Sequence, residues 1–200
     1  MIGLTFQSGE HRRFSETLAF TLNNPIRRFL DRPEQLISKL NVGSADTAVD
    51  FGCGTGFFTI PLASVAGRTI AIDVSSKMLC SIASYAKRHG LAIELLKSDG
   101  TEIGLQGESV DLILLVHVLH EVENGPRVLD GFLRIMKPAG RLVIVEKTRG
   151  SRILSGRLGP PIVNELEIIR EIEKVGFSFS QTLPFGKDSI LVCQKTGAKP

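Results

Sequence analysis

The fold of this chain is set by the stretch Val49-Asp50-Phe51-Gly52-Cys53-Gly54-Thr55-Gly56, an apolar strand that carries a carboxylate and then breaks into three alternate glycines. Glycines at this spacing let the backbone turn sharply out of a strand and approach a ligand where a Cβ would collide. Two further apolar runs end in acids, one at Asp73 and the next at Asp99. Together these features predict a cofactor site at the ends of successive strands.

A dinucleotide-binding loop is the competing interpretation of the glycines. Its G-x-G-x-x-G pattern needs a third glycine where this chain has Phe57, and it must admit a pyrophosphate at a helix N-terminus. Here Asp50 lies two residues before the first glycine, and a carboxylate suits a ligand that carries an ammonium and a sulfonium. A purely structural glycine turn is also disfavoured, because Asp73 and Asp99 recur at the ends of the following strands.

In their order and spacing, these motifs resemble the class I S-adenosylmethionine-dependent methyltransferases. Asp50 to Gly56 is similar to the first motif of that family, and Ala71 to Ser75 is similar to the motif whose acid holds the ribose hydroxyls. Ser98-Asp99-Gly100 resembles the segment that reads the adenine amino group, and Arg134 to Leu142 resembles the turn into the fifth strand. The resemblance therefore implies S-adenosylmethionine as cofactor and S-adenosylhomocysteine as product.

The resemblance also implies which residues bind this cofactor. They lie in the glycine loop and at the ends of the second, third and fourth strands: Asp50, Gly52, Cys53, Gly54, Gly56, Asp73, Val74, Ser98, Asp99, Gly100 and Val116.

The alternation of apolar runs and amphipathic stretches predicts an α/β fold, with a Rossmann-like, seven-stranded, mostly parallel sheet and helices on both faces. Helices are expected over 76–89, 125–136 and 164–175. Pro61 predicts that the first helix either starts late or has an open first turn. The resemblance implies that the last strand is antiparallel. Strands are expected near 46–51, 68–73, 92–97, 110–117, 140–146, 177–183 and 188–195.

The 200 residues fit one compact domain. Residues 41–200 are expected to form the cofactor-binding part, and residues 1–40, which include Phe14, a helical segment. In similar methyltransferases such segments fold over the cofactor as a lid, whereas core packing is the alternative for Phe14. The loop Gly159-Pro160-Pro161 either shapes the acceptor pocket or is a rigid connector.

Charge and composition exclude several kinds of partner. With 24 basic and 21 acidic residues, the net charge of +3 gives no strong attraction to nucleic acid or an anionic membrane. The longest uncharged apolar run is too short to span a bilayer, and no secretion signal is recognised. Three cysteines indicate reduced thiols and a cytoplasmic protein. A small-molecule methyl acceptor is expected, a nucleic acid is not, and a homodimer is left open.

Candidate catalytic residues follow the fourth and fifth strands. Ligands of open α/β sheets lie beyond the carboxyl ends of the strands where the strand order reverses, so the glycine loop and residues 116–122 are expected to meet there. A general base is needed only when the acceptor arrives protonated. His120, Glu121 and Glu146 are the candidates. The alternatives are that His120 and Glu121 help to start a helix and that Glu146 is a solvated strand-end carboxylate. A metal site at His117, His120 and Glu121 is disfavoured, because a third separated ligand is missing.

Two hypotheses of function remain open. The first is methyl transfer to a small molecule, since the chain resembles the small enzymes related to the ubiquinone and menaquinone C-methyltransferases and the arsenite methyltransferases. Arsenite enzymes need a set of thiolates, but Cys53, Cys80 and Cys193 lie in different elements. The second hypothesis is a non-catalytic module that binds S-adenosylmethionine or S-adenosylhomocysteine without turnover.

Overall fold

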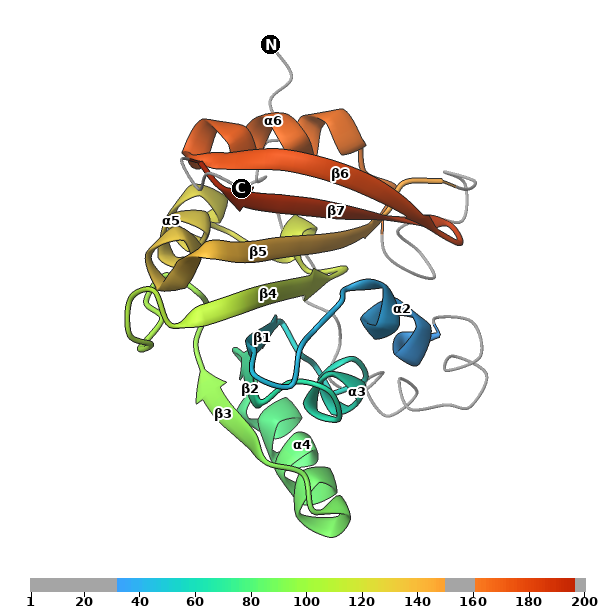
Figure 1. The fold of residues 1–200 in the computed structure, drawn as a ribbon, viewed down its shortest axis with the longest axis vertical. Helices are drawn as coiled ribbons and strands as arrows, with labels where there is room; N and C mark the ends of the chain where they lie inside the picture. Colours follow the sequence, from blue (N-terminus) through green and yellow to red (C-terminus); the bar gives the residue numbers. More distant parts are fainter. Residues whose placement is uncertain (1–31, 150–160, 197–200) are drawn as a thin grey trace. The chain divides into compact units, whose positions relative to one another are not determined.

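The computed structural model describes residues 32–149 and 161–196 (Figure 1). Its strands form a seven-stranded mixed sheet in the order β3-β2-β1-β4-β5-β7-β6. β7 runs antiparallel to both of its neighbours, β5 and β6. The predicted Rossmann-like fold class, including the antiparallel last strand, is therefore confirmed. Residues 1–31 of the expected N-terminal lid segment 1–40, with Phe14, and the loop residues Gly159 and Pro160 lie outside the described residues.

The described residues fall into two compact units, 32–99 and 100–196. The first unit contains three parallel strands with β2 in the middle, and α4 packs against β2 and β3 while α3 packs against β2. Its core includes the completely buried Ile82 and Ala71. Its elements are α2 (Pro33–Lys39), β1 (Thr47–Phe51), α3 (Thr59–Ala63), β2 (Arg68–Asp73), α4 (Ser76–His89) and β3 (Ile93–Lys97).

Local signals set the bounds of α4 and α3. The hydroxyl of Ser75 accepts a hydrogen bond from the N–H of Met78, which caps the start of α4, and Gly90 ends it with φ 65°. The predicted span 76–89 is confirmed. Pro61 is the third residue of α3, which begins only at Thr59. Of the two alternatives that Pro61 predicts, the late start is the one that the chain adopts, and residues 54–58 form turns.

The second unit contains β4 and β5 as a parallel pair, followed by the antiparallel β7 and β6. α6 packs against β6, and α5 packs against α6. The centres of β4 and β5 are fully buried, as are Phe132 and Ile172. Its elements are β4 (Val110–Val116), the 3-10 turn η2 (Leu119–Glu121), α5 (Gly125–Ile135), β5 (Met136–Lys147), α6 (Glu165–Val175), β6 (Phe177–Phe185) and β7 (Asp188–Lys195).

Several predicted strand bounds differ from the structure by one to four residues, and two of these differences have a clear cause. β5 starts at Met136 instead of residue 140, because Met136 already pairs with Val110 and the irregularity lies between Val110 and Leu112. β4 ends at Val116, one residue early, because His117 adopts a left-handed backbone conformation with φ 56°. Among the described residues, no helix has the length and apolar character needed to cross a membrane.

Candidate functional site

The loop after β1 contains three glycines with left-handed backbone conformations, and two of them, Gly56 and Gly54, differ in their surroundings. At Gly56, with φ 88°, a Cβ would lie 2.8 Å from Cγ1 of Ile82, so this glycine lets the loop pack closely against α4. At Gly54, with φ 53°, a Cβ would meet no atom within 4 Å. The loop therefore leaves space at Gly54 for a ligand to approach its backbone.

The backbone N–H groups of this loop are largely used within the protein. Those of Gly52 and Cys53 donate to the carbonyl oxygen of Ile72 at 2.8 and 3.1 Å. The N–H of Gly56 donates to the carbonyl of Cys53 at 3.0 Å, and that of Gly54 donates to Oδ2 of Asp73 at 2.9 Å. These four N–H groups therefore have partners within the protein, and the loop offers a ligand open space and side chains.

Asp73 braces the glycine loop from the end of β2. Its Oδ2 accepts the bond from Gly54, and its Oδ1 accepts a hydrogen bond from the N–H of Ser75 at 2.8 Å. A carboxylate has about four acceptor positions, so two remain for hydroxyl groups of a ligand. The next side chain, Val74, is 47% exposed, which is unusual for a valine and presents an apolar surface beside the carboxylate.

Asp50 is a buried carboxyl group beneath the loop. It is 3% exposed, and its Oδ2 accepts a hydrogen bond from the hydroxyl of Thr59 at 2.6 Å. Burial raises the pKa of Asp50 to about 7; the bond from Thr59 lowers it and the charge of Asp73 raises it further. Sequence reasoning missed Thr59, because nothing in the spacing of residues 50 and 59 marks them as partners.

The raised pKa of Asp50 predicts pH-dependent binding of a ligand that brings an ammonium group. The cation favours the ionised carboxylate, so its binding must displace the proton wherever the pH lies below the pKa of the free protein. Affinity for S-adenosylhomocysteine is therefore expected to fall about tenfold between pH 7 and pH 5.5. Calorimetry at the two pH values measures this change. Asp50→Asn should bind with nearly equal affinity at both, and a wild-type affinity that does not change would contradict the assignment.

The features around the glycine loop fit S-adenosylmethionine. Open space lies at Gly54, two carboxyl groups lie beneath and beside the loop, and Val74 offers an apolar surface. The hydroxyl of Thr55 is buried and has no hydrogen-bond partner among the described residues, which leaves it for a polar group of a ligand. At the end of β3, the N–H of Ser98 donates to the carbonyl of Asp73 at 3.2 Å, while Asp99 is exposed.

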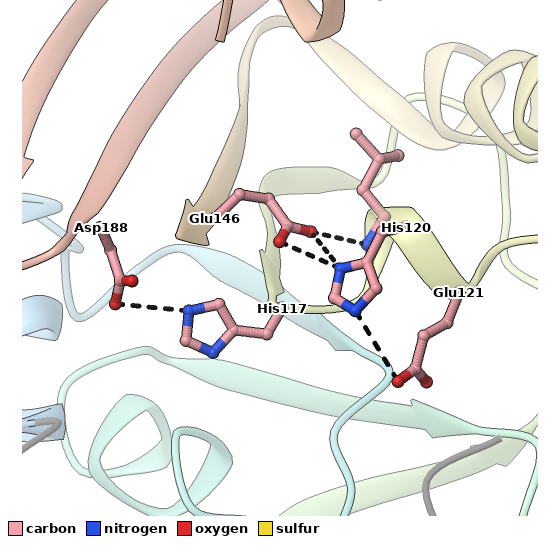
Figure 2. Close-up of polar contacts among 6 residues, drawn as sticks. His117, His120, Glu121, Glu146 and Asp188 are labelled. Carbon is pink, nitrogen blue, oxygen red and sulfur yellow. Dashed lines mark hydrogen bonds and ion pairs between the residues drawn. The ribbon is translucent and has the colours of Figure 1, made fainter. Parts of the chain in front are cut away.

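A second group of polar residues follows β4 and β5 in the unit 100–196 (Figure 2). Glu146, at the end of β5, is 1% exposed. Its Oε1 accepts hydrogen bonds from the N–H of Leu119 at 3.1 Å and from Nδ1 of His120 at 3.2 Å, and its Oε2 lies 3.1 Å from the same Nδ1. The alternative of a solvated Glu146 is therefore wrong, and the carboxylate fixes both the backbone and the imidazole of the turn.

The environment of His120 sets its protonation. Burial lowers the pKa of His120, but the hydrogen bond and charge of Glu146 and the charge of Glu121 outweigh burial and hold the pKa above its usual value. Because Nδ1 binds Glu146, the neutral ring carries its proton on Nδ1 and has its lone pair on Nε2. Nε2 lies 3.9 Å from Oε1 of Glu121. His120 and Glu121 belong to η2 and not to α5, which begins at Gly125.

His117 has a carboxylate partner that sequence reasoning missed. Its Nε2 lies 3.3 Å from Oδ2 of Asp188, the first residue of β7. No local signal could have identified this pair, because it depends on the register that places Asp188 beside Lys147. Val116, the predicted cofactor residue at the end of β4, directly precedes His117 and is partly exposed.

Two of the three thiols are buried in the described ranges, 32–149 and 161–196. Cys53 and Cys193 are buried, and burial raises the pKa of the Cys193 thiol to about 12 and that of Cys53 still further. Both behave as small apolar residues. Within these ranges, no three His, Cys, Asp or Glu side chains are arranged to hold a metal ion.

Comparison with known proteins agrees with the geometry. Residues 49–144 match the family described as a methyltransferase domain. The demethylmenaquinone methyltransferase of Oceanobacillus iheyensis is 31% identical over 122 residues, which are 58% of this chain and 51% of that protein. The ubiquinone biosynthesis O-methyltransferase of Rickettsia conorii is 27% identical over 132 residues, 65% of this chain and 43% of that protein. The chain thus spans about half the length of the curated relatives it matches.

A solved structure matches over a greater length. The structure of a SAM-dependent methyltransferase from Aquifex aeolicus superimposes with a TM-score of 0.81 at 26% identity, covering 91% of this chain and 98% of that chain. Motifs, fold and relatives agree: residues 49–144 of this chain match a methyltransferase domain, and the fold is similar to that of a SAM-dependent methyltransferase.

Proposed function

We propose that this protein binds S-adenosylmethionine and transfers its methyl group to a small-molecule acceptor that arrives protonated. The observation that carries the catalytic part is the pair formed by His120 and the buried Glu146. Burying a carboxylate costs free energy unless it is paired and hydrogen-bonded. An imidazole held in one tautomer by such a carboxylate is the arrangement that a general base requires.

Most of the proposed cofactor contacts lie in the unit 32–99. The carboxylate of Asp73 has acceptor positions left for ribose hydroxyls, and the exposed Val74 offers an apolar surface to the purine. Asp50 balances the charge of the ammonium group. The remaining proposed positions are Gly52, Cys53, Gly54 and Gly56 in the loop, with Ser98, Asp99, Gly100 and Val116 at the ends of β3 and β4.

The chemistry is divided between cofactor and protein. S-adenosylmethionine supplies a methyl group on a positively charged sulfur, which needs no further activation. Nε2 of His120 takes the proton of the acceptor, and Glu146 holds the opposite side of the ring and stabilises the resulting imidazolium. Glu121, 3.9 Å from Nε2, adds negative charge that favours the same protonated state.

The acceptor class follows from the requirement for a base and from the relatives. A thioether or a tertiary amine needs no base, whereas a hydroxyl group does. Relatives of this chain are named for the methylation of demethylmenaquinone and for ubiquinone biosynthesis. A small hydroxylated aromatic molecule is therefore the proposed acceptor. A cytoplasmic location is proposed because all three cysteines are free thiols.

Two measurements separate the enzyme from a non-catalytic binding module. Calorimetry with S-adenosylhomocysteine tests the cofactor site alone. Release of S-adenosylhomocysteine from S-adenosylmethionine, measured with a mixture of hydroxylated aromatic molecules, then tests turnover. Binding together with turnover is expected. Binding without turnover across the mixture would favour the module, and no binding of either ligand by the folded protein would refute the proposed cofactor site.

A further inference from the structure

The turn directly after β4 uses a histidine in a backbone conformation that favours glycine. His117 has φ 56°, whereas the residue directly after β1 is Gly52, with φ 70°. The N–H of His117 donates to the carbonyl oxygen of Val145 at 2.9 Å, so β5 fixes this backbone. When the surroundings hold a residue other than glycine in a disfavoured backbone conformation, its side chain is a candidate for a functional role.

The imidazole of His117 is held at one nitrogen. Nε2 lies 3.3 Å from Oδ2 of Asp188, and the side chains of His117 and Asp188 are 18% and 21% exposed. Nε2 is buried and has no well-aligned hydrogen bond with any described residue, so the adjacent carboxylate is its electrostatic partner. A carboxylate beside Nε2 favours the proton on that nitrogen, which leaves the lone pair of the neutral ring on Nδ1.

His117 and His120 therefore form two carboxylate-held imidazoles on one turn. Glu146 of β5 hydrogen-bonds Nδ1 of His120, whereas Asp188 of β7 lies 3.3 Å from Nε2 of His117 as an electrostatic partner without a well-aligned hydrogen bond. Figure 2 shows one nitrogen of each ring facing its carboxylate, Glu146 for His120 and Asp188 for His117, while the second nitrogen of His120 is directed at Glu121, 3.9 Å away. Nδ1 of His117 and Nε2 of His120 are therefore two hydrogen-bond acceptors on one turn, which match a ligand with two donors.

We propose that His117, held by Asp188, is a second acceptor-binding residue, whose Nδ1 accepts a hydrogen bond from a second hydroxyl or N–H group of the methyl acceptor. The inference rests on the proposed function and narrows its substrate class to small molecules with two such donors. One donor loses its proton to His120 and is methylated, and the other stays bound to His117. A site that hydrogen-bonds a substrate hydroxyl discriminates strongly against the analogue that lacks it.

The test uses matched pairs of probe acceptors that differ by one hydroxyl group. Phenol is compared with catechol and hydroquinone, and 1-naphthol with 1,2- and 1,4-dihydroxynaphthalene. The wild-type protein is expected to show a kcat/KM at least about tenfold higher for one dihydroxy member than for its monohydroxy partner. His117→Gly should abolish this preference by raising KM for the dihydroxy compound, with little change for the monohydroxy compound.

The variants are chosen so that folding does not obscure the result. Glycine and asparagine both accept the left-handed backbone, so His117→Gly and His117→Asn should keep an unfolding temperature close to the wild-type value. Asp188→Asn should reduce the preference as well, and combining it with His117→Gly should add nothing further, since Asp188 acts through His117. Nitrogen-15 NMR should show neutral His117 protonated on Nε2 and neutral His120 on Nδ1, and Asp188→Asn should change the His117 signals alone.

The outcomes separate this inference from the function on which it rests. A wild-type protein without preference in any pair, or a His117→Gly variant that loses both members of a pair equally, overturns the role of His117. Binding of S-adenosylhomocysteine without turnover of any probe overturns the acceptor site as a whole but leaves the cofactor site intact. Failure to bind S-adenosylhomocysteine overturns the proposed function itself.

Discussion

His120→Ala is expected to lower the turnover number by a factor of about 10² to 10⁴, the usual contribution of a positioned general base. Its affinity for S-adenosylhomocysteine should stay within about twofold of the wild-type value, since the proposed cofactor contacts all lie on other residues. Release of S-adenosylhomocysteine measures the first quantity and calorimetry the second. Undiminished turnover would show that the acceptor is deprotonated elsewhere or that no base is needed.

Glu146→Gln is the matched companion of this variant, because it keeps the shape of the side chain and removes its charge. Turnover should rise with pH through the pKa of His120, which lies above its usual value in the wild type. Without the negative charge, the pKa of His120 falls, so the rising part of the pH profile moves to lower pH while the plateau falls. A profile that did not move would contradict the contact between Glu146 and His120.

Asp73→Ala is expected to weaken binding of S-adenosylhomocysteine by about 30-fold, or about 2 kcal/mol, the typical worth of a hydrogen bond to a charged group. The variant also removes the acceptor for the N–H groups of Gly54 and Ser75, so the glycine loop loses its brace and the unfolding temperature should fall. Calorimetry measures the affinity, and thermal unfolding of the ligand-free protein measures the second effect.

Two controls separate ligand contact from loop support. Asp73→Asn retains a carbonyl acceptor but not the charge, so it should bind more weakly than the wild type and remain more stable than Asp73→Ala. Gly54→Val leaves Asp73 in place and puts a side chain into the open space at the loop. It should block the ligand, although the left-handed φ of Gly54 also makes it less stable. If both Asp73 variants bound S-adenosylhomocysteine as tightly as the wild type, the assignment of Asp73 as a cofactor-binding residue would be refuted.

The sequence predicts best what depends on neighbouring residues. α4 runs over the predicted residues because its cap, Ser75, and its terminator, Gly90, are both local signals. The start of β5 is misplaced because Lys137-Pro138 is typical of a turn, while the pairing of Met136 with Val110 depends on a strand distant in sequence. Local chemistry thus predicts the elements, and their exact bounds follow from pairing.

The sequence predicts which residues belong to the candidate site, but it does not predict which of them contact one another. Glu146 and His120 were each expected to take part, but the register that pairs Val116 with Val145 is what brings the buried carboxylate to the turn. The pairing of His117 with Asp188 depends in the same way on the alignment of β5 with β7. Asp50 was expected to contact a ligand, and its burial against Thr59 depends on how the turns after Gly56 fold back.

The unequal burial of the three thiols has a practical consequence. Cys53 and Cys193 are enclosed and hold their protons, whereas Cys80 is exposed on α4. A maleimide dye added to the native protein should therefore attach at one position, without mutagenesis and without touching the glycine loop. Such a label sits on the helix that Ser75 caps directly beyond Asp73, where fluorescence can follow ligand binding in real time.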